Sequence, residues 1–229
     1  MSERVRVGVL VSGRGTNLAA LLERSVDPSF PAEVVLVASN RPSAGGLEIA
    51  ARHDVEAFAL PVKHFGGDAV ARDIVFRDRF LAAGVQLVIT AGYDRVLAHE
   101  FLEAFPNAML NVHPSLLPAF GGGMTGVVEA MEYGVKVAGC TVQLLEPGRP
   151  DGGAIILQAP VPVLEDDDVA TLHARIHAQE WIVLPEAVAL WSHGRLVREG
   201  RRIRILPPNS RNVPGVQAGT TPLSTRQEV

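Results

Sequence analysis

The sequence predicts an α/β fold, with a Rossmann-like, mostly parallel twisted sheet, helices on both faces and an antiparallel C-terminal extension. Three observations support this class. Apolar strand-like runs alternate with helix-like segments over residues 5–113, which is typical of repeated βαβ units. A glycine-rich turn follows the first of these runs. After residue 136, two β-rich segments follow one another across a turn-forming stretch, which favours antiparallel pairing.

The first half begins with residues 5–11, a continuous apolar run expected of a strand buried on both faces. Three helices and three further strands then alternate, judged by the spacing of apolar residues. The predicted helices are 18–22, 46–53 and 68–83, and the predicted strands are 34–39, 57–62 and 85–90.

The second half continues with a short helix, a strand and a helix ended by Gly134. These are followed by the two β-rich segments and by a long helix that begins at acidic residues 166–168 and that Pro185 is expected to kink or break. A last strand and a loosely ordered tail rich in Pro, Gly, Ser, Thr and Gln complete the chain. In order, the predicted ranges are 98–104, 108–113, 127–133, 137–145, 154–163, 166–184, 196–206 and 207–229.

Composition and charge narrow the classes of function. The 229 residues are 47% hydrophobic, and the formal net charge is −4 without a long basic run, so nucleic acid is not an expected partner. No apolar stretch approaches the ~18 residues that cross a membrane, and the N-terminus leads into a strand pattern rather than a signal sequence. With Cys140 as the only cysteine, an internal disulfide is impossible. We expect a cytoplasmic protein acting on small molecules, as a monomer or homodimer.

The segment 110–118, Leu-Asn-Val-His-Pro-Ser-Leu-Leu-Pro, ends a buried-strand pattern with two side chains that can polarise a carbonyl. Asn111 and His113 are two residues apart on an extended chain, so they project from the same face. Such a pair can bind a developing oxyanion, and His113 can also move a proton. The alternative is a strand end with a capping Asn and a satisfied surface His.

The segment 12–17, Ser-Gly-Arg-Gly-Thr-Asn, lies between the first strand and the first helix. Glycines permit positive φ, and a helix N-terminus favours an anion. A dinucleotide loop is excluded because Leu18 replaces the third glycine of G-x-G-x-x-G and Asn40, rather than an acidic residue, ends the second strand. A Walker A loop is excluded because no Gly-Lys-Ser/Thr follows. The segment therefore predicts a monophosphate ester site, with an ordinary glycine turn as the alternative.

Asp151 lies in a loop beside Gly152 and Gly153, before the strand 154–163. A carboxylate near an imidazole can hold it in one protonation state and relay protons. Its role depends on whether it faces His113, since loop carboxylates are otherwise solvated.

Together with Ile-Ile-Leu-Gln at 155–158, these segments resemble the folate-dependent formyltransferases, and among them the glycinamide ribonucleotide formyltransferases of purine synthesis. The resemblance covers residues 5–206. His-Pro-Ser-Leu-Leu-Pro at 113–118 is shared with formyltetrahydrofolate hydrolases, whereas the loop 12–17 narrows the acceptor to a ribose phosphate. The resemblance implies that the amine of glycinamide ribonucleotide directly attacks the formyl group of 10-formyltetrahydrofolate, without a metal, on the de novo route to IMP.

The resemblance also implies roles for individual residues, and these residues fall into three groups. The catalytic group is Asn111, His113 and Asp151, the phosphate contacts are Gly15, Thr16 and Asn17, and Glu180 contacts glycinamide ribonucleotide. The folate is expected at Tyr93, Asp94, Arg95, Val96 and Leu97 and beside Asn111. One domain, 1–206, would then have a phosphate-binding half (1–105) and a catalytic and folate half (106–206).

The chain departs from the family pattern in four places. Met124 and Gln143 stand where histidines are usual, and the loop 143–151 is one residue longer than the common form. The usual arginine for the folate's glutamate tail aligns with Ala69, for which Arg72 or Lys63 could substitute. These changes bear on substrate affinity and rate more than on the class of reaction.

The sequence allows three other interpretations. A formyltetrahydrofolate hydrolase would use water as acceptor, but the retained phosphate loop argues against it. A non-catalytic module that binds folate or a phosphorylated metabolite is conceivable because two histidines are missing. His173 and His177 have the i, i+4 spacing of a metal site, but no third ligand pattern accompanies them, so no metal is predicted.

Overall fold

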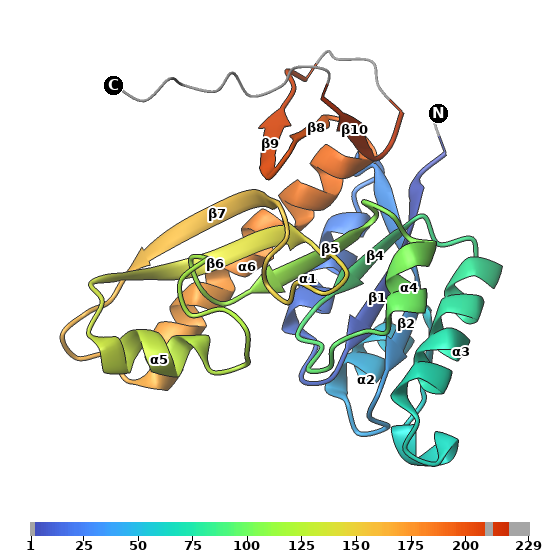
Figure 1. The fold of residues 1–229 in the computed structure, drawn as a ribbon, viewed down its shortest axis with the longest axis horizontal. Helices are drawn as coiled ribbons and strands as arrows, with labels where there is room; N and C mark the ends of the chain where they lie inside the picture. Colours follow the sequence, from blue (N-terminus) through green and yellow to red (C-terminus); the bar gives the residue numbers. More distant parts are fainter. Residues whose placement is uncertain (1–2, 209–212, 220–229) are drawn as a thin grey trace.

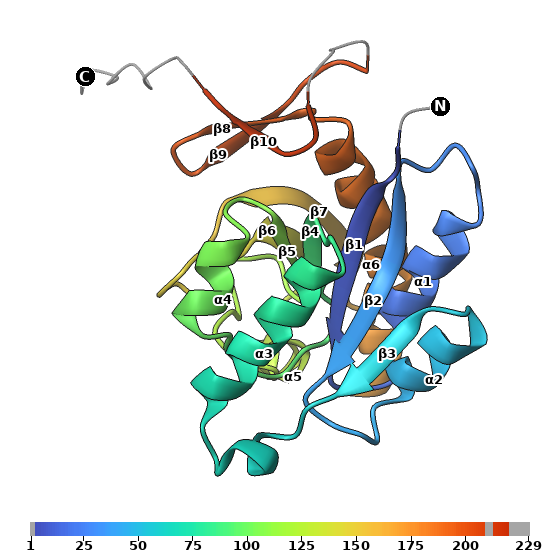
Figure 2. The same ribbon diagram turned by 90° about the vertical axis from the view of Figure 1, so that its right-hand side faces the viewer.

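One sheet organises the molecule, with helices on both faces (Figures 1 and 2). The computed structural model describes residues 3–208 and 213–219. Within these ranges the sheet has ten strands in the order β10-β8-β9-β7-β6-β5-β4-β1-β2-β3. The predicted fold class is confirmed, because β1 to β5 are parallel and β6 and β7 continue the sheet in antiparallel pairing.

The first half alternates strands and helices as predicted, and the ends of the predicted elements differ from the observed ones by about three residues at most. A short 3-10 helix, η1, follows β3 and was not predicted. The elements are β1 (Val5–Val11), α1 (Thr16–Ser25), β2 (Ala32–Ser39), α2 (Gly45–Arg52), β3 (Glu56–Ala59), η1 (Val62–Phe65), α3 (Ala69–Ala82), β4 (Leu87–Thr90), α4 (His99–Ala104) and β5 (Met109–His113).

The second half contains the antiparallel extension and the longest helix. Its elements are α5 (Gly126–Tyr133), β6 (Val137–Leu144), β7 (Ile155–Pro162), α6 (Val169–Ser192), β8 (Leu196–Glu199), β9 (Arg202–Ile205) and β10 (Val216–Ala218). In Figure 1, β6 and β7 extend away from the parallel strands, and β8, β9 and β10 lie beyond the C-terminal end of α6. None of the helices in the described ranges is long and apolar enough to span a membrane.

Pro185 lies inside α6 without breaking it, so of the predicted kink or break, the break was wrong. Proline removes one backbone donor from a helix, but α6 packs along α1, β6 and β7, and tertiary packing of this kind outweighs local propensity. The start of the helix follows the sequence more closely. Asp168 is the N-cap and forms a reciprocal capping box with Thr171, through two hydrogen bonds of 2.8 Å.

The single strand predicted at 196–206 was also wrong, because the segment folds back as the β8–β9 hairpin. Glu199 pairs with Arg202 across a two-residue turn, where Gly200 adopts a φ of 64° that favours glycine. The segment predicted as a loosely ordered tail contains β10, which pairs with β8. The parts of that prediction at 209–212 and 220–229 lie outside the described residues.

Two hydrophobic cores lie on opposite faces of the sheet. One core is shared with α1, α2, α5 and α6 and includes the alternate residues Val7 and Val9 of β1. The other is shared with α3 and α4 and includes Leu10 and Phe80. Gly8 of β1 faces this second core, where an added Cβ would lie 2.3 Å from the Phe80 ring, so the absence of a side chain lets the ring lie on the sheet.

The strand order creates a crevice where the chain connections diverge. β1 lies between β4 and β2, and the segments after β1 and β4 lead to helices on opposite faces. Ligands of open α/β sheets bind outside the carboxyl ends of the strands at such a switch point.

Candidate active site

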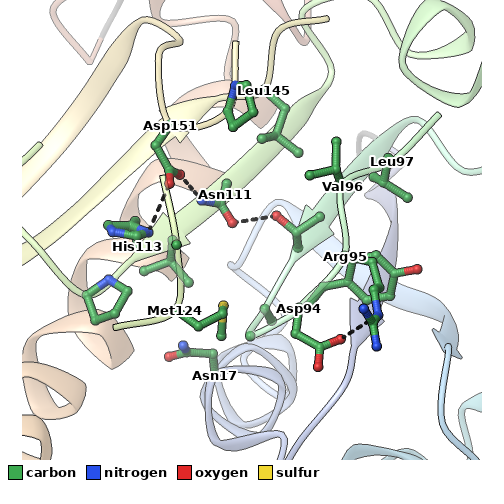
Figure 3. A pocket seen from close by; sticks show the side chains of 18 of the residues that line it. Asn17, Asp94, Arg95, Val96, Leu97, Asn111, His113, Met124, Leu145 and Asp151 are labelled. Carbon is green, nitrogen blue, oxygen red and sulfur yellow. Dashed lines mark hydrogen bonds and ion pairs between the residues drawn. The ribbon is translucent and has the colours of Figure 1, made fainter. Parts of the chain in front are cut away.

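A cavity of about 560 Å³ opens at the carboxyl ends of β1, β4 and β5. Its walls are the loop after β1, the segment 90–97, the end of β5, the loop 145–151 and one face of α6. Every residue that the sequence predicted for the site lines this one cavity, although they come from positions between 15 and 180. Figure 3 shows Asn111, His113 and Asp151 together on one side, with Asn17 and the 94–97 segment around them.

Asn111 is oriented by its neighbour on β4. The Thr90 hydroxyl donates a 2.7 Å hydrogen bond to Oδ1 of Asn111, so the amide nitrogen points the other way, 3.5 Å from Oδ1 of Asp151 (Figure 3). Thr90 and Asn111 meet because β4 and β5 pair in register at this point. Sequence analysis missed Thr90, although its position at the end of a predicted strand could have indicated it.

His113 is almost fully buried, and both of its ring nitrogens face acceptors. Nε2 lies 3.1 Å from the carbonyl oxygen of Phe120, and Nδ1 lies 3.5 Å from Oδ2 of Asp151. Only the imidazolium form has N–H donors on both nitrogens. The arrangement therefore suits a ring that carries a proton and can deliver it.

Asp151 is held by donors from two other segments. The Gly122 N–H donates to Oδ2 at 2.8 Å, and Nε2 of Gln143 donates to Oδ1 at 3.0 Å. Asp151 itself has a φ of 50°, a left-handed conformation that non-glycine residues adopt at a cost. The longer loop thus still brings the carboxylate beside His113.

The loop between β1 and α1 has the features of an anion site. Gly15 is the N-cap of α1 with a φ of 80°, and a Cβ there would lie 2.5 Å from Cα of Gly46. The first helical hydrogen bond runs from Ala19 to Gly15, so the N–H groups of the preceding turn have no helical partner. That turn holds no acidic side chain, and its partial positive charge attracts an anion.

The Asn17 side chain is engaged elsewhere than expected for a phosphate contact. Its Nδ2 donates to Oε2 of Glu180 at 2.8 Å, while its Oδ1 is buried without a partner. One of the two amide hydrogens is thus committed to Glu180, and the unpaired Oδ1 is an acceptor, which suits a hydroxyl or amine better than a phosphate. The backbone N–H groups of Thr16 and Asn17 remain the donors available to an anion.

One face of α6 completes this end of the cavity. Glu180 is 2% exposed and lies 2.8 Å from Nδ1 of His177. His173 stacks on His177 with ring centroids 4.1 Å apart, and both rings line the cavity. Sequence analysis weighed this pair only as metal ligands and predicted no metal there. In the described ranges, no group of three or more His, Cys, Asp or Glu side chains is arranged to hold one.

The segment 93–97 forms the opposite wall, where the folate was expected. Asp94 accepts a 3.0 Å hydrogen bond from Asn40 and forms an ion pair with Arg41. Burial opposes the charge of Asp94, but hydrogen bonds from Ser12 and Asn40 and the nearby Arg41 outweigh it, so the pKa of this carboxyl is lowered. The turn that forms this wall is thus held in place by Asp94, whose carboxylate is negatively charged.

Apolar side chains of the same wall differ in exposure. Val96 is 76% exposed, whereas Tyr93 and Leu97 are buried. Burial raises the pKa of Tyr93 well above its usual range, so its hydroxyl stays neutral. Exposed Val96 and the 64% exposed Met124, both among the lining residues, offer an apolar surface to a planar ligand.

Arg72 is not placed to replace the arginine that, in the family pattern, binds the glutamate tail of the folate. It is 2% exposed and forms an ion pair with Asp73 at 2.8 Å, while Asp73 also accepts from the N–H of Ala98 at 2.9 Å. Arg72 therefore belongs to the support of the segment before α4. Lys63, the other candidate, is exposed on η1 and is not among the residues that line the cavity.

Comparison with known proteins identifies the family. A model of the formyl transferase family matches residues 5–188, which is well over half of the chain. The chain belongs to the formyl transferase family. The strand order and the cavity described above therefore belong to a formyl transferase.

Relatives within the formyl transferase family carry more specific names. Phosphoribosylglycinamide formyltransferase of Mycobacterium tuberculosis H37Rv is 42% identical over 89% of this chain and 95% of that protein. The crystal structure of glycinamide ribonucleotide transformylase 1 from Symbiobacterium toebii is 48% identical, with a TM-score of 0.87 over 90% of this chain and 96% of that one. The trifunctional purine biosynthetic protein adenosine-3 of Drosophila melanogaster is 40% identical over 83% of this chain, which spans only 14% of its length.

Proposed function

We propose that this formyl transferase transfers the formyl group of 10-formyltetrahydrofolate to the amine of glycinamide ribonucleotide, in the cytoplasm and in de novo purine synthesis. One observation carries the proposal. Asn111, His113 and Asp151 lie in the same cavity as the N-terminus of α1, so a substrate with a phosphate on α1 can present a second group to the trio. The names of the relatives agree with this substrate.

The phosphate of the acceptor would bind the backbone N–H groups at Thr16 and Asn17, beside Gly15. Glu180 and the free Oδ1 of Asn17 are acceptors, so they suit hydroxyl or amine donors of the same molecule. The folate would lie against residues 93–97, with its formyl group next to Asn111. The phosphate site then lies within the half 1–105 and the catalytic trio within the half 106–206, whereas the folate contacts residues of both halves, because the segment 93–97 belongs to the first.

The chemical step needs a donor for the developing oxyanion and a path for one proton. The amine attacks the formyl carbon. The amide of Asn111, fixed by Thr90, donates to the oxygen, and the imidazolium of His113 stabilises the developing negative charge from beside it. The proton lost by the amine passes to the folate nitrogen as the carbon–nitrogen bond to the folate breaks. Asp151, beside His113 and Asn111, is placed to relay that proton.

The first experiment incubates the purified chain with 10-formyltetrahydrofolate, with and without glycinamide ribonucleotide, and measures deformylated folate and formylated acceptor. We expect turnover only with the acceptor, and its loss in Asp151→Asn, which keeps the size of the side chain. Turnover without acceptor would instead favour the hydrolase. Binding of both ligands without turnover would favour the binding module, and either result would overturn the proposal.

A further inference from the structure

Two histidines on α6 form a stacked pair that the proposed chemistry does not use. His173 and His177 are one helical turn apart, with ring planes inclined by 24° and centroids 4.1 Å apart. Both line the cavity that also contains Arg14 and the loop residues up to Asn17. The hydrogen bond between Asn17 and Glu180, at the next turn of α6, ties this helix face to the start of α1.

We propose that the His173–His177 pair is a proton-linked clamp for a phosphomonoester: when the phosphate binds at the N-terminus of α1, the pair takes up one proton and releases it when the phosphate leaves. The identity of the phosphomonoester rests on the proposed function, but the coupling does not. Formyl transfer itself requires no such proton.

His173 is poised to be neutral before the phosphate binds. Burial lowers the pKa of His173, and His177 and Arg14 lower it further, whereas Glu180 acts in the opposite direction. On the sheet side, Cys140 of β6 adds no charge, because burial raises the pKa of its thiol to about 12.

A bound phosphate reverses this balance. A phosphomonoester carries a charge of about −1.5 to −2 near neutral pH, and an opposite charge within ~4–6 Å favours the protonated form of an imidazole. Glu180 bonds to Nδ1 of His177 at 2.8 Å, which leaves His173 as the member of the pair that is free to change. The cavity thus gains positive charge only when an anion is present to meet it.

Calorimetry with ribose 5-phosphate tests the coupling without any formyl transfer. The titration is repeated at about pH 7 in non-phosphate buffers of different ionisation enthalpy, because the slope of the heat against that enthalpy gives the protons taken up. We expect uptake of about half to one proton per phosphate for the unmodified chain. Affinity should also fall between about pH 7 and pH 8, opposite to the effect of the ligand's own ionisation, since its second pKa is about 6.

Two substitutions at one position separate charge from structure. His173→Asn should abolish the proton uptake and weaken the binding of ribose 5-phosphate by about tenfold at pH 7, which corresponds to about 1.4 kcal/mol. His173→Lys, with a permanent charge, should keep the affinity but lose the uptake and the pH dependence between pH 7 and 8. The exposed His64 of η1, outside the cavity, provides the control, since His64→Asn should leave both properties unchanged.

The outcomes distinguish this inference from the proposed function. Undiminished proton uptake in His173→Asn, or none in the unmodified chain, would overturn the clamp even if glycinamide ribonucleotide is formylated. Uptake that depends on His173 in a chain that transfers no formyl group would support the clamp and remove the proposed reaction. Failure to bind either ribose 5-phosphate or glycinamide ribonucleotide would overturn both.

Discussion

Gln143 donates a 3.0 Å hydrogen bond from Nε2 to Oδ1 of Asp151 while its own side chain has no exposed surface. It occupies this place because β6 pairs with β5 so that Gln143 lies opposite Asn111. Its other amide atom, Oε1, is buried without a partner. A neutral donor therefore supports the carboxylate at the position where the family resemblance predicts a histidine, and this donor does not titrate.

Gln143→Leu should lower kcat/KM by about tenfold, because Asp151 loses one donor and the loss of about 1.4 kcal/mol of positioning corresponds to that factor. The free energy of unfolding should change by less than about 1 kcal/mol, because leucine is of similar size and the change also removes the unpaired Oε1. Steady-state kinetics and urea unfolding measure the two quantities. Gln143→His, which restores an N–H donor, should retain most of the activity. Full activity of the leucine variant would mean that the Gly122 N–H and His113 are sufficient.

Asn111→Ala should lower kcat by about a hundredfold or more, since losing one oxyanion donor costs about 2.7 to 4 kcal/mol in the barrier. KM for the acceptor should change much less, because the phosphate is bound at the other end of the cavity. Single-turnover rates and binding measured separately would test this division. A large rise in KM with unchanged kcat would assign Asn111 to binding instead.

Thr90→Val should reproduce part of the loss in kcat that is expected for Asn111→Ala. The change keeps the shape of the side chain but removes the hydroxyl that fixes Oδ1 of Asn111, so the amide can turn its oxygen toward the oxyanion. We expect kcat to fall about tenfold, and Thr90→Ser, which keeps the hydroxyl, to remain close to the unmodified chain. Because the two residues act as a unit, Thr90→Val should cost nothing further in the Asn111→Ala background. Equal losses in both backgrounds would contradict the orienting role.

The order of the parallel half followed from the sequence because its strands are buried on both faces and its helices have clear apolar periodicity. The break at Pro185 and the single strand at 196–206 were predicted wrongly. Packing against the sheet holds α6 together across a missing donor, and the turn at Gly200 requires only two residues between β8 and β9. Neither effect is visible in the spacing of apolar residues.

More residues of the candidate site were predicted than physical reasoning alone allowed, because the family resemblance supplied Glu180 and the 93–97 segment. The partners of two further residues were not predicted. Thr90 meets Asn111 through strand register, and His173 lines the cavity together with the loop after β1. Both are tertiary relationships between segments far apart in the chain, so no local pattern shows which partner each residue meets.

Gly8→Ala tests the packing between the sheet and α3. The new methyl would lie 2.3 Å from Cε1 of Phe80 and 3.1 Å from Cγ1 of Val85, so the fully buried ring must shift. Overpacking of this kind costs about 1 to 3 kcal/mol, which denaturant unfolding would detect. Gly13→Ala is the matched control, because its added methyl meets nothing within 4 Å. A variant at Gly8 as stable as the control would show that the core accommodates the methyl without strain.

Arg198 of β8 connects the C-terminal hairpin to the loop that carries Asp151. Its Nη2 lies 2.6 Å from Oε1 of Glu146, and its Nη1 donates to Asn107 at 3.2 Å. Because Glu146 begins the loop 146–151 and lines the cavity, Arg198→Ala should loosen the loop. We expect kcat/KM to fall about threefold to tenfold, with a stability loss of only about 1 kcal/mol, since the pair is partly exposed.

Hydrogen exchange of the loop amides separates a tether from a general loss of stability. In Arg198→Ala, exchange should accelerate in residues 146–153 but not in the parallel strands. Arg204→Ala is the control, because Arg204 forms a comparable ion pair with Glu199 within the same hairpin, at 3.1 Å, and does not line the cavity. If both variants lower activity equally, the hairpin as a whole stabilises the fold and Arg198 has no special part in holding Asp151.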